Sequence, residues 1–229
     1  MGMAVTATRS GPRDPGGCAS MERLRTIVRG DIDETICRGE EQADHWFRVV
    51  TGAARRCSLN AYGRRQIVDF LLPGDAFGFD APALHECSAE VVCAGTTMAR
   101  YPRRGLEDLA ESDLQVSRCL CDMALDSIAR LQTRTLILGH GSALARVSAF
   151  LLDWADRCDP GRDSAISLPM SRYDIADYLG IAVETVSRTL TVLRTRHVIA
   201  LRATRCFTIC DREALELATE GGDESSLAN

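Results

Sequence analysis

Short alternating apolar segments follow one another through the first half of the chain, and turns rich in glycine and proline separate them. Pro73-Gly74-Asp75, for example, ends one such segment. Short apolar runs punctuated about every ten residues are typical of antiparallel sheets. We therefore expect a β-sandwich or β-roll that is large enough to bury its own core. The expected strands are 46–50, 53–59, 65–72, 91–93 and 97–101.

A long helix is predicted next, from about Ser112 to Leu138, because this stretch contains no Pro or Gly and Gly139 follows it. Six residues along it recur at alternating steps of three and four, which places a narrow apolar stripe on one face. The stripe packs either on the chain's own sheet or on a second copy. We favour a homodimer, since the outer face is too polar to be buried. The six residues of this stripe, which we call the seam, are Cys121, Ala124, Ile128, Leu131, Thr135 and Leu138.

The last third, after a shorter predicted helix over 143–154, contains two amphipathic helices on either side of a glycine. Ser171 can cap the first helix, and Asp174 favours the positive end of its dipole. Gly180 breaks the chain, and the second helix starts near Ala182. This is a helix-turn-helix, in which the second helix enters the major groove of DNA. Apolar segments at 198–201 and 206–210 predict a two-stranded wing after it.

The outward side chains of the second helix suit the edges of bases. Arg188 can bond guanine, Glu184 can accept from cytosine, and Val183 can contact a thymine methyl. The alternative is a surface ion pair between Glu184 and Arg188, worth about 0.3–0.5 kcal/mol. We favour DNA contact, because a turn glycine and basic flanks accompany these residues. The expected DNA contacts are Ser171, Arg172, Val183, Glu184, Thr185, Ser187, Arg188 and Arg194.

The net charge of −5 at first argues against a nucleic-acid partner. Residues 169–210, however, contain six arginines and three acids, which gives this segment a local excess of positive charge. Arginine concentrated on a small module is the electrostatic signature of phosphate contact. The charge must therefore be considered by region, and the basic region coincides with the predicted helix-turn-helix.

Composition excludes several other classes of protein. With 45% apolar and 26% charged residues, the 229-residue chain has the balance of a globular protein. No apolar run reaches the ~20 residues of a membrane span, and residues 1–20 lack the apolar centre of a signal peptide, so we expect a cytoplasmic protein. All 27 basic residues are arginine, which excludes lysine Schiff-base chemistry. No catalytic constellation appears, so we do not expect an enzyme.

Two stretches resemble the CRP/FNR family of transcription factors, and in particular its FixK-type branch. The run LPMSRYDIADYLGIAVETVSRTL resembles the family's DNA-binding motif, and FRVVTGAARRCSLNAYGRRQIVDFLLPGDAFG resembles its N-terminal β-roll. The resemblance extends over about residues 22–218. It implies an α+β fold with a cyclic-nucleotide-binding-like antiparallel β-roll, a long dimerisation helix and a winged helix-turn-helix.

The resemblance also implies a function. Family members are homodimers that bind inverted repeats in DNA, and the FNR-like pattern of Glu184, Ser187 and Arg188 implies a TTGAT-type half-site. Half-sites of a two-fold dimer lie about one helical turn, ~34 Å, apart. The implied role is a regulator, most simply an activator acting with RNA polymerase, of genes for low-oxygen respiration, denitrification or nitrogen fixation.

The expected organisation has five parts. A flexible arm is followed by the β-roll, the dimerisation helix, the DNA-binding domain and a flexible tail. Family members commonly have a glycine after the recognition helix, whereas this chain has Thr195-Arg196-His197, so the wing's first turn departs from the family's pattern. The expected boundaries are 1–21, 22–111, 112–139, 140–218 and 219–229.

The roll departs from cyclic-nucleotide-binding relatives, which pair the phosphate with an arginine. Between Gln66 and Ala99 this chain has no arginine and five acids, so an anionic phosphate would be left unpaired. We therefore expect no cyclic nucleotide. The acids are Asp69, Asp75, Asp80, Glu86 and Glu90.

The ten cysteines leave a sensor alternative open. An FNR-type iron–sulfur cluster needs closely spaced N-terminal cysteines, whereas Cys18 stands alone before Cys37, so we expect no metal and no cofactor. Most cysteines are expected to be buried as small apolar residues. Cys206 or Cys210 near DNA remains a candidate redox thiol. A haem sensor is the other alternative, with His45, His85, His140 and His197 as available axial ligands.

Overall fold

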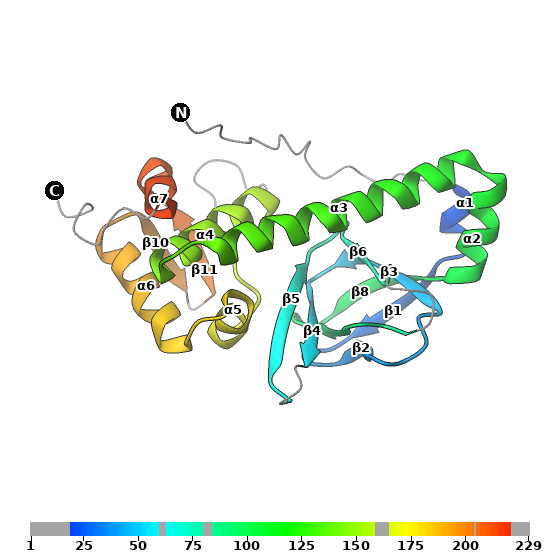
Figure 1. Ribbon diagram of the computed structural model, residues 1–229, viewed down its shortest axis with the longest axis horizontal. Helices are drawn as coiled ribbons and strands as arrows, with labels where there is room; N and C mark the ends of the chain where they lie inside the picture. Colours follow the sequence, from blue (N-terminus) through cyan, green and yellow to red (C-terminus); the bar gives the residue numbers. More distant parts are fainter. Residues whose placement is uncertain (1–18, 60–62, 80–83, 159–164, 204, 221–229) are drawn as a thin grey trace.

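Two lobes lie along one long helix in the computed structural model (Figure 1), which describes residues 19–59, 63–79, 84–158, 165–203 and 205–220. The N-terminal lobe is a β-roll and the C-terminal lobe is a small helical domain with a three-stranded sheet. The predicted fold class is confirmed. Most of the expected arm and nearly all of the expected tail lie outside the described residues.

The roll consists of two four-stranded sheets in which neighbouring strands are antiparallel. The strand orders are β1-β8-β3-β6 and β2-β7-β4-β5. Phe47, Leu71, Phe77, Val91 and Met98 are buried between the sheets, as the alternating pattern of each strand requires. The strands are β1 (Thr26–Gly30), β2 (Thr35–Cys37), β3 (His45–Thr51), β4 (Ala54–Leu59), β5 (Arg65–Leu71), β6 (Ala76–Phe77), β7 (Ser88–Val91) and β8 (Thr96–Pro102).

Four of the five expected strands match β3, β4, β5 and β8 to within one residue at each end. The fifth is wrong: the strand expected at 91–93 is β7, which ends at Val91. The chain leaves the sheet there because it turns at Gly95, whose φ is +70°. Strands β1, β2 and β6 were not predicted, since two of them have only two or three residues.

The long helix is preceded by a second helix that the sequence did not predict. Helix α2 (Arg103–Ser112) is followed by Asp113, which has extended backbone, and α3 (Leu114–Gly139) starts directly after it. The Asp113 carboxylate caps α3 by accepting from the Gln115 amide, so the expected start at Ser112 is two residues early. At the N-terminus, α1 (Ala19–Glu22) begins inside the expected arm, and Met21 is buried.

Helix α3 presents two different faces. One face is buried against the chain itself, along Val116, Leu120, Met123, Ser127, Arg130 and Ile137. The seam residues lie on the other face: Cys121, Ile128 and Thr135 are exposed, and the other three are half-buried. The chain's own sheet therefore leaves half of the seam exposed, and pairing with a second copy stays a prediction. Within the described residues, none of the helices has the length and apolar character that crossing a membrane requires.

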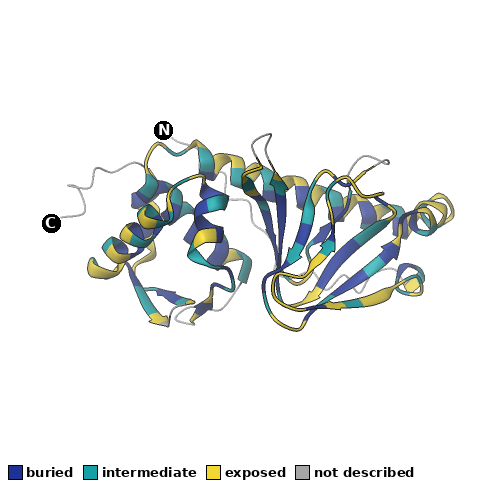
Figure 2. Cartoon of the chain, turned by 90° about the horizontal axis from the view of Figure 1, so that it is seen from below, coloured by how far each residue is buried: buried dark blue, intermediate teal, exposed yellow. Residues whose placement is uncertain are grey.

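The C-terminal lobe packs its helices around one aromatic cluster. Phe150 and Trp154 of α4 and Tyr178 of α5 surround Phe70, which comes from β5 of the roll. Figure 2 shows the buried faces of these helices turned inwards. The two lobes thus share part of one hydrophobic core. The elements of this lobe are α4 (Ala143–Cys158), β9 (Ile166–Ser167), α5 (Arg172–Leu179), α6 (Val183–Thr195), β10 (Ile199–Ala203), β11 (Cys206–Ile209) and α7 (Arg212–Thr219).

Candidate nucleic-acid interface

A complete capping box begins the helix-turn-helix. The Ser171 hydroxyl oxygen accepts from the Asp174 amide at 3.1 Å, and the Asp174 carboxylate accepts from the Ser171 amide at 3.0 Å. The first helix ends at Gly180, whose φ of +64° is the left-handed conformation that favours glycine. The predicted cap and turn are both confirmed.

Helix α6, the candidate recognition helix, begins after Ala182 as predicted. Its inner face is anchored by Val186, Leu190 and Leu193, which are buried. Its outer face leaves Glu184 and Arg188 exposed. Both residues lie in the described part of the chain, and no ion pair there joins them. The surface-pair alternative is therefore not realised, and both side chains are available to a partner.

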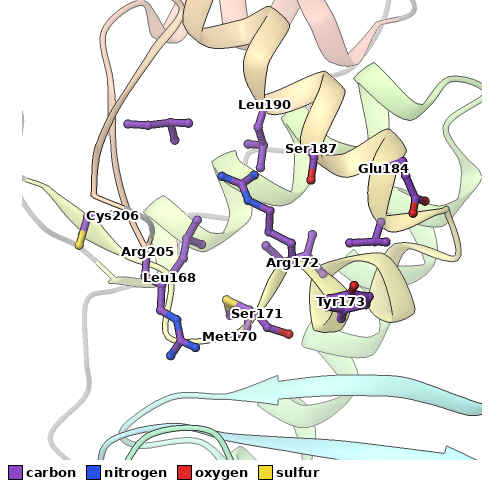
Figure 3. Close-up of a pocket in the computed structure, with 13 residues that line it drawn as sticks. Leu168, Met170, Ser171, Arg172, Tyr173, Glu184, Ser187, Leu190, Arg205 and Cys206 are labelled. Carbon is purple, nitrogen blue, oxygen red and sulfur yellow. The ribbon is translucent and has the colours of Figure 1, made fainter.

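A cleft of about 620 Å³ opens between α5, α6 and the wing (Figure 3). The Arg172 side chain extends from α5 towards Ser187 of α6 in this view. Thr185, Arg188 and Arg194 are not part of its lining. The cleft brings together five of the expected DNA contacts: Ser171, Arg172, Val183, Glu184 and Ser187.

The wing supplies an arginine that the expected set left out. Arg205 lies between β10 and β11, lines the same cleft, and donates to the Pro169 carbonyl at 3.2 Å. The sequence signal that could have identified Arg205 is its place as a basic residue between the two predicted wing strands. At the wing's first turn, His197 adopts a φ of +57°. A non-glycine residue thus takes the left-handed conformation where the family resemblance leads one to expect glycine, and the turn is still made.

The acids of α5 are turned away from this interface. Asp174 and Asp177 pair with Arg55 and Arg65, which come from the roll. Burial alone would raise the pKa of Asp174, but hydrogen bonds from Ser171 and the charges of Arg55 and Arg65 lower it below its usual value. In the charge count over residues 169–210, both acids offset arginines of that segment. The interface is therefore more positive than that count indicated.

Inside the roll, three of the acids expected to repel a phosphate are already paired. Arg130 of α3 reaches Asp69 and Asp75 at 3.0 Å each, and Arg157 of α4 reaches Asp75 at 2.8 Å. Glu90 is similarly paired with Arg55. Asp80 lies outside the described residues. The expectation that no cyclic nucleotide binds therefore rests on the missing arginine of the 67–98 segment rather than on repulsion.

The cysteines differ from expectation. Of the nine in the described residues only Cys37 and Cys57 are buried, and burial together with nearby Glu90 raises the pKa of the Cys57 thiol to about 12. Cys206 lines the cleft and Cys210 is exposed, whereas Cys18 lies outside the described part. Among described residues no group of three or more His, Cys, Asp or Glu is arranged to hold a metal ion.

Comparison with known proteins gives consistent matches over both lobes. Residues 145–218 match the family described as Crp-like helix-turn-helix domain, and residues 30–113 match the one described as Cyclic nucleotide-binding domain. The nitrogen fixation regulation protein FixK of Rhizobium meliloti is 44% identical over 199 residues, which cover 87% of this chain and 90% of that protein. The transcriptional activatory protein AadR of Rhodopseudomonas palustris is 36% identical over 193 residues, covering 83% and 80%.

A solved structure shows the same arrangement of lobes. FixK2 from Bradyrhizobium japonicum superposes with a TM-score of 0.78 at 36% sequence identity, covering 85% of this chain and 97% of that one. These proteins are named as regulators rather than enzymes, which agrees with the prediction that this chain is not an enzyme.

Proposed function

This chain belongs to the FixK-type branch of the CRP/FNR family of DNA-binding transcription regulators, and from that premise we propose that it activates transcription from promoters carrying a TTGAT-type inverted repeat. The observation that carries the proposal is the outer face of α6. There Glu184, which lines the cleft, and Arg188, one helical turn further on, stand exposed and have no ion pair within the described chain.

Recognition divides between two kinds of contact. Glu184, Ser187 and Arg188 are proposed to read base edges, with Arg188 bonding guanine O6 and N7 and Glu184 accepting from cytosine N4. Ser171 and Arg172 on α5 and Arg194 at the end of α6 are proposed to contact phosphates. Val183 and Thr185 complete the proposed surface at the first turn of α6. Base contacts supply the specificity, and phosphate contacts set the register and most of the affinity.

A homodimer is part of this proposal. The seam of α3 leaves Cys121, Ile128 and Thr135 exposed in a single chain, and three-four spacing suits a parallel helix pair. A two-fold axis along α3 presents two copies of α6 to half-sites about 34 Å apart. Pairing thus covers the seam and produces the symmetry of an inverted repeat.

The proposed regulation is of low-oxygen, denitrification or nitrogen-fixation genes, through contact with RNA polymerase in the cytoplasm. The name of the related FixK, a nitrogen fixation regulation protein, supports the nitrogen-fixation part of this assignment, and that of AadR, a transcriptional activatory protein, supports activation. We propose further that the chain works without a cyclic nucleotide, because the 67–98 segment offers no arginine to a phosphate. We also propose that it has no other resident cofactor, because Cys18 stands alone before Cys37 and an FNR-type cluster needs closely spaced N-terminal cysteines. The domain boundaries set out from the sequence remain part of the same proposal.

The test is a binding titration followed by fluorescence anisotropy. The full chain is titrated into a duplex with two inverted TTGAT half-sites, and into duplexes with one or both half-sites scrambled. We expect binding to the intact repeat to be at least ~10³-fold tighter than to the fully scrambled duplex. Sedimentation is expected to show two chains per duplex. Equal affinity for all three duplexes contradicts the proposal.

Two controls separate its parts. Ile128→Asp places a charge in the seam, and it is expected to abolish dimers and high-affinity binding while leaving the folded monomer intact. An absorbance spectrum and total iron on anaerobically purified protein test the absence of a cofactor. A haem or iron–sulfur band with stoichiometric iron contradicts that part of the proposal and assigns the chain to the direct sensors.

A further inference from the structure

Two arginines of the roll reach across to the first helix of the helix-turn-helix. Arg55 of β4 donates to the Asp174 carboxylate at 3.1 Å, and Arg65 of β5 donates to the same oxygen at 2.9 Å. Arg65 also makes two hydrogen bonds to Asp177, one helical turn further on, at 3.0 and 3.2 Å. We call these four residues the interdomain latch. It joins segments more than a hundred positions apart in the sequence.

The roll end of the latch is held on more than one side. The Arg55 guanidinium also donates to Glu90 of β7 at 2.8 Å and to Asp33 at 2.7 Å, and its side chain is only 8% exposed. A planar guanidinium bound on three edges has little freedom to swing away. The latch is thus anchored in one of the roll's sheets rather than on a mobile surface arginine.

The other end of the latch is the helix cap itself. Asp174 accepts from the roll arginines through Oδ1 and from the Ser171 amide and hydroxyl through Oδ2. The two oxygens of one carboxylate therefore connect the roll to the residue that begins α5. Ser171 is one of the proposed phosphate contacts. Any rotation of α5 relative to the roll breaks these bonds and displaces that contact.

The latch leaves the reading surface open. Glu184 and Arg188 on α6 remain exposed while all of its ion pairs are formed. In Figure 1, α5 lies between α6 and the roll, so the latch holds the first helix and does not touch the second. Its carboxylates belong to side chains that are mostly covered, where salt screens an ion pair much less than at the surface. This arrangement orients the domain and does not block it.

We infer that Arg55 and Arg65 are positioning residues for DNA recognition, which fix the orientation of the helix-turn-helix on the roll so that a dimer presents its two recognition helices at one separation without a bound effector. The inference rests on the proposed DNA-binding function. In this inference the ion pairs of the latch orient the helix-turn-helix permanently, so no ligand is needed to do so.

The test measures how strongly binding depends on half-site spacing. The parent and Arg65→Gln are titrated with inverted repeats at the preferred spacing and with one base pair more or fewer. Arg65 is chosen because it is one-third exposed, whereas Arg55 is buried. Arg29→Gln is the matched control: it removes the same charge from an exposed site on β1 with no ion pair in the described chain. Arg65→Lys tests rescue by a retained charge.

We expect Arg65→Gln to bind the preferred repeat about tenfold more weakly, within the usual 5–150-fold range for coupling between sites. Its preference among the three spacings is expected to flatten, while discrimination against a single base change persists. Arg29→Gln is expected to behave as the parent, and Arg65→Lys to regain most of the spacing preference. Asp177→Asn, which spares the bond between Arg65 and Asp174, is expected to give a smaller change that is not additive with Arg65→Gln.

The outcomes separate the two proposals. If the parent does not distinguish the intact repeat from scrambled DNA, the proposed function fails. If the parent does so and a folded Arg65→Gln keeps both its affinity and its spacing preference, only the positioning role is overturned. A loss that is equal at all spacings also overturns it, because it indicates a general effect on binding. Should Arg65→Gln not fold, unchanged spacing preference in Asp177→Asn overturns the role instead.

Discussion

The buried junctions of this molecule and its recognition surface use the same side chain for opposite purposes. At the junctions between α3, α4 and the roll, Arg130 and Arg157 are 2% and 6% exposed and pair with carboxylates. On α6, Arg188 and Arg194 are exposed, and neither has an ion pair in the described chain. Since every basic residue is arginine, residue type alone separates neither group. What separates them is whether an acid from a distant strand reaches the guanidinium.

The difference has an energetic consequence. Removing one partner of a buried arginine–carboxylate pair leaves the other charge uncompensated. The contribution of the pair therefore appears in the free energy of unfolding. An exposed arginine costs almost nothing when it is removed from the free protein, and its worth appears only when DNA is present. The two groups should therefore respond differently to mutation, pH and salt.

The largest effect is expected from Arg130→Met. The variant leaves Asp69 without its guanidinium, Asp75 with only Arg157, and the Ala76 carbonyl without the donor at 3.0 Å. We expect a loss of about 3–5 kcal/mol in the free energy of unfolding, measured by urea titration. The control Arg29→Met is expected to change it by less than about 0.5 kcal/mol. A loss below ~1 kcal/mol for Arg130→Met contradicts the expected difference between buried and exposed arginines.

A smaller loss is expected from Asp174→Asn, about 1.5–3 kcal/mol at pH 7, because hydrogen bonds to a charged group are lost. The folded pKa of Asp174 lies below its usual value of 3.8. The stabilisation by its charge is therefore fully present above that value and disappears as the pH falls through the folded pKa. The difference in unfolding free energy between parent and variant should stay constant from pH 6 to pH 4 and shrink as the pH falls below 3.8. Curves that stay parallel contradict the assignment.

Arg188→Ala is expected to leave unfolding almost unchanged and to weaken binding to the inverted repeat by about 1–3 kcal/mol. The loss should be confined to sequences that carry the contacted guanine, so replacing that base in the DNA should cost the variant nothing further. Anisotropy titrations on both duplexes measure this. Parent-like affinity of Arg188→Ala for the intact repeat would show that α6 does not read the DNA as proposed.

The smallest effect is expected from Arg194→Ala, which removes a proposed phosphate contact. Binding to all sequences should weaken alike, and the slope of log affinity against log salt concentration should fall by about 0.9. Arg29→Ala serves as the matched control, with an unchanged slope. Loss of discrimination between sequences in Arg194→Ala would instead identify it as a base contact.

The helix-turn-helix was predictable because its signals are local. The cap Ser171, the turn glycine Gly180 and the inward residues of α6 lie within 23 positions, and no distant partner is needed to interpret them. The seam, which stays a prediction, also rests on a local signal, since its spacing repeats along one helix. The left-handed turn at His197 was not predictable, because a histidine gives no signal for a positive φ.

The rest depended on distant partners. Arg130 occupies a heptad position on the buried face of α3, where a sequence pattern treats arginine as a surface residue. Its acids lie more than fifty positions away. In the sequence, Asp174 and Asp177 count as charges that neutralise their own segment. Only the fold shows that they form ion pairs with Arg55 and Arg65. Strand β6 likewise exists only through pairing with β3.

The shared carboxylate of Asp174 has an evolutionary consequence. The Asp174 side chain both caps α5 and accepts hydrogen bonds from two arginines of the roll. A substitution at position 174 therefore loses the cap and also leaves the arginines at positions 55 and 65 without this partner, unless those positions change with it. Across homologous sequences these three positions are expected to vary together, whereas the exposed Arg29 drifts independently. A horizontally exchanged DNA-binding domain would have to arrive with a roll that matches it. Interdomain compatibility, more than operator sequence, would then decide which chimaeras of such regulators survive.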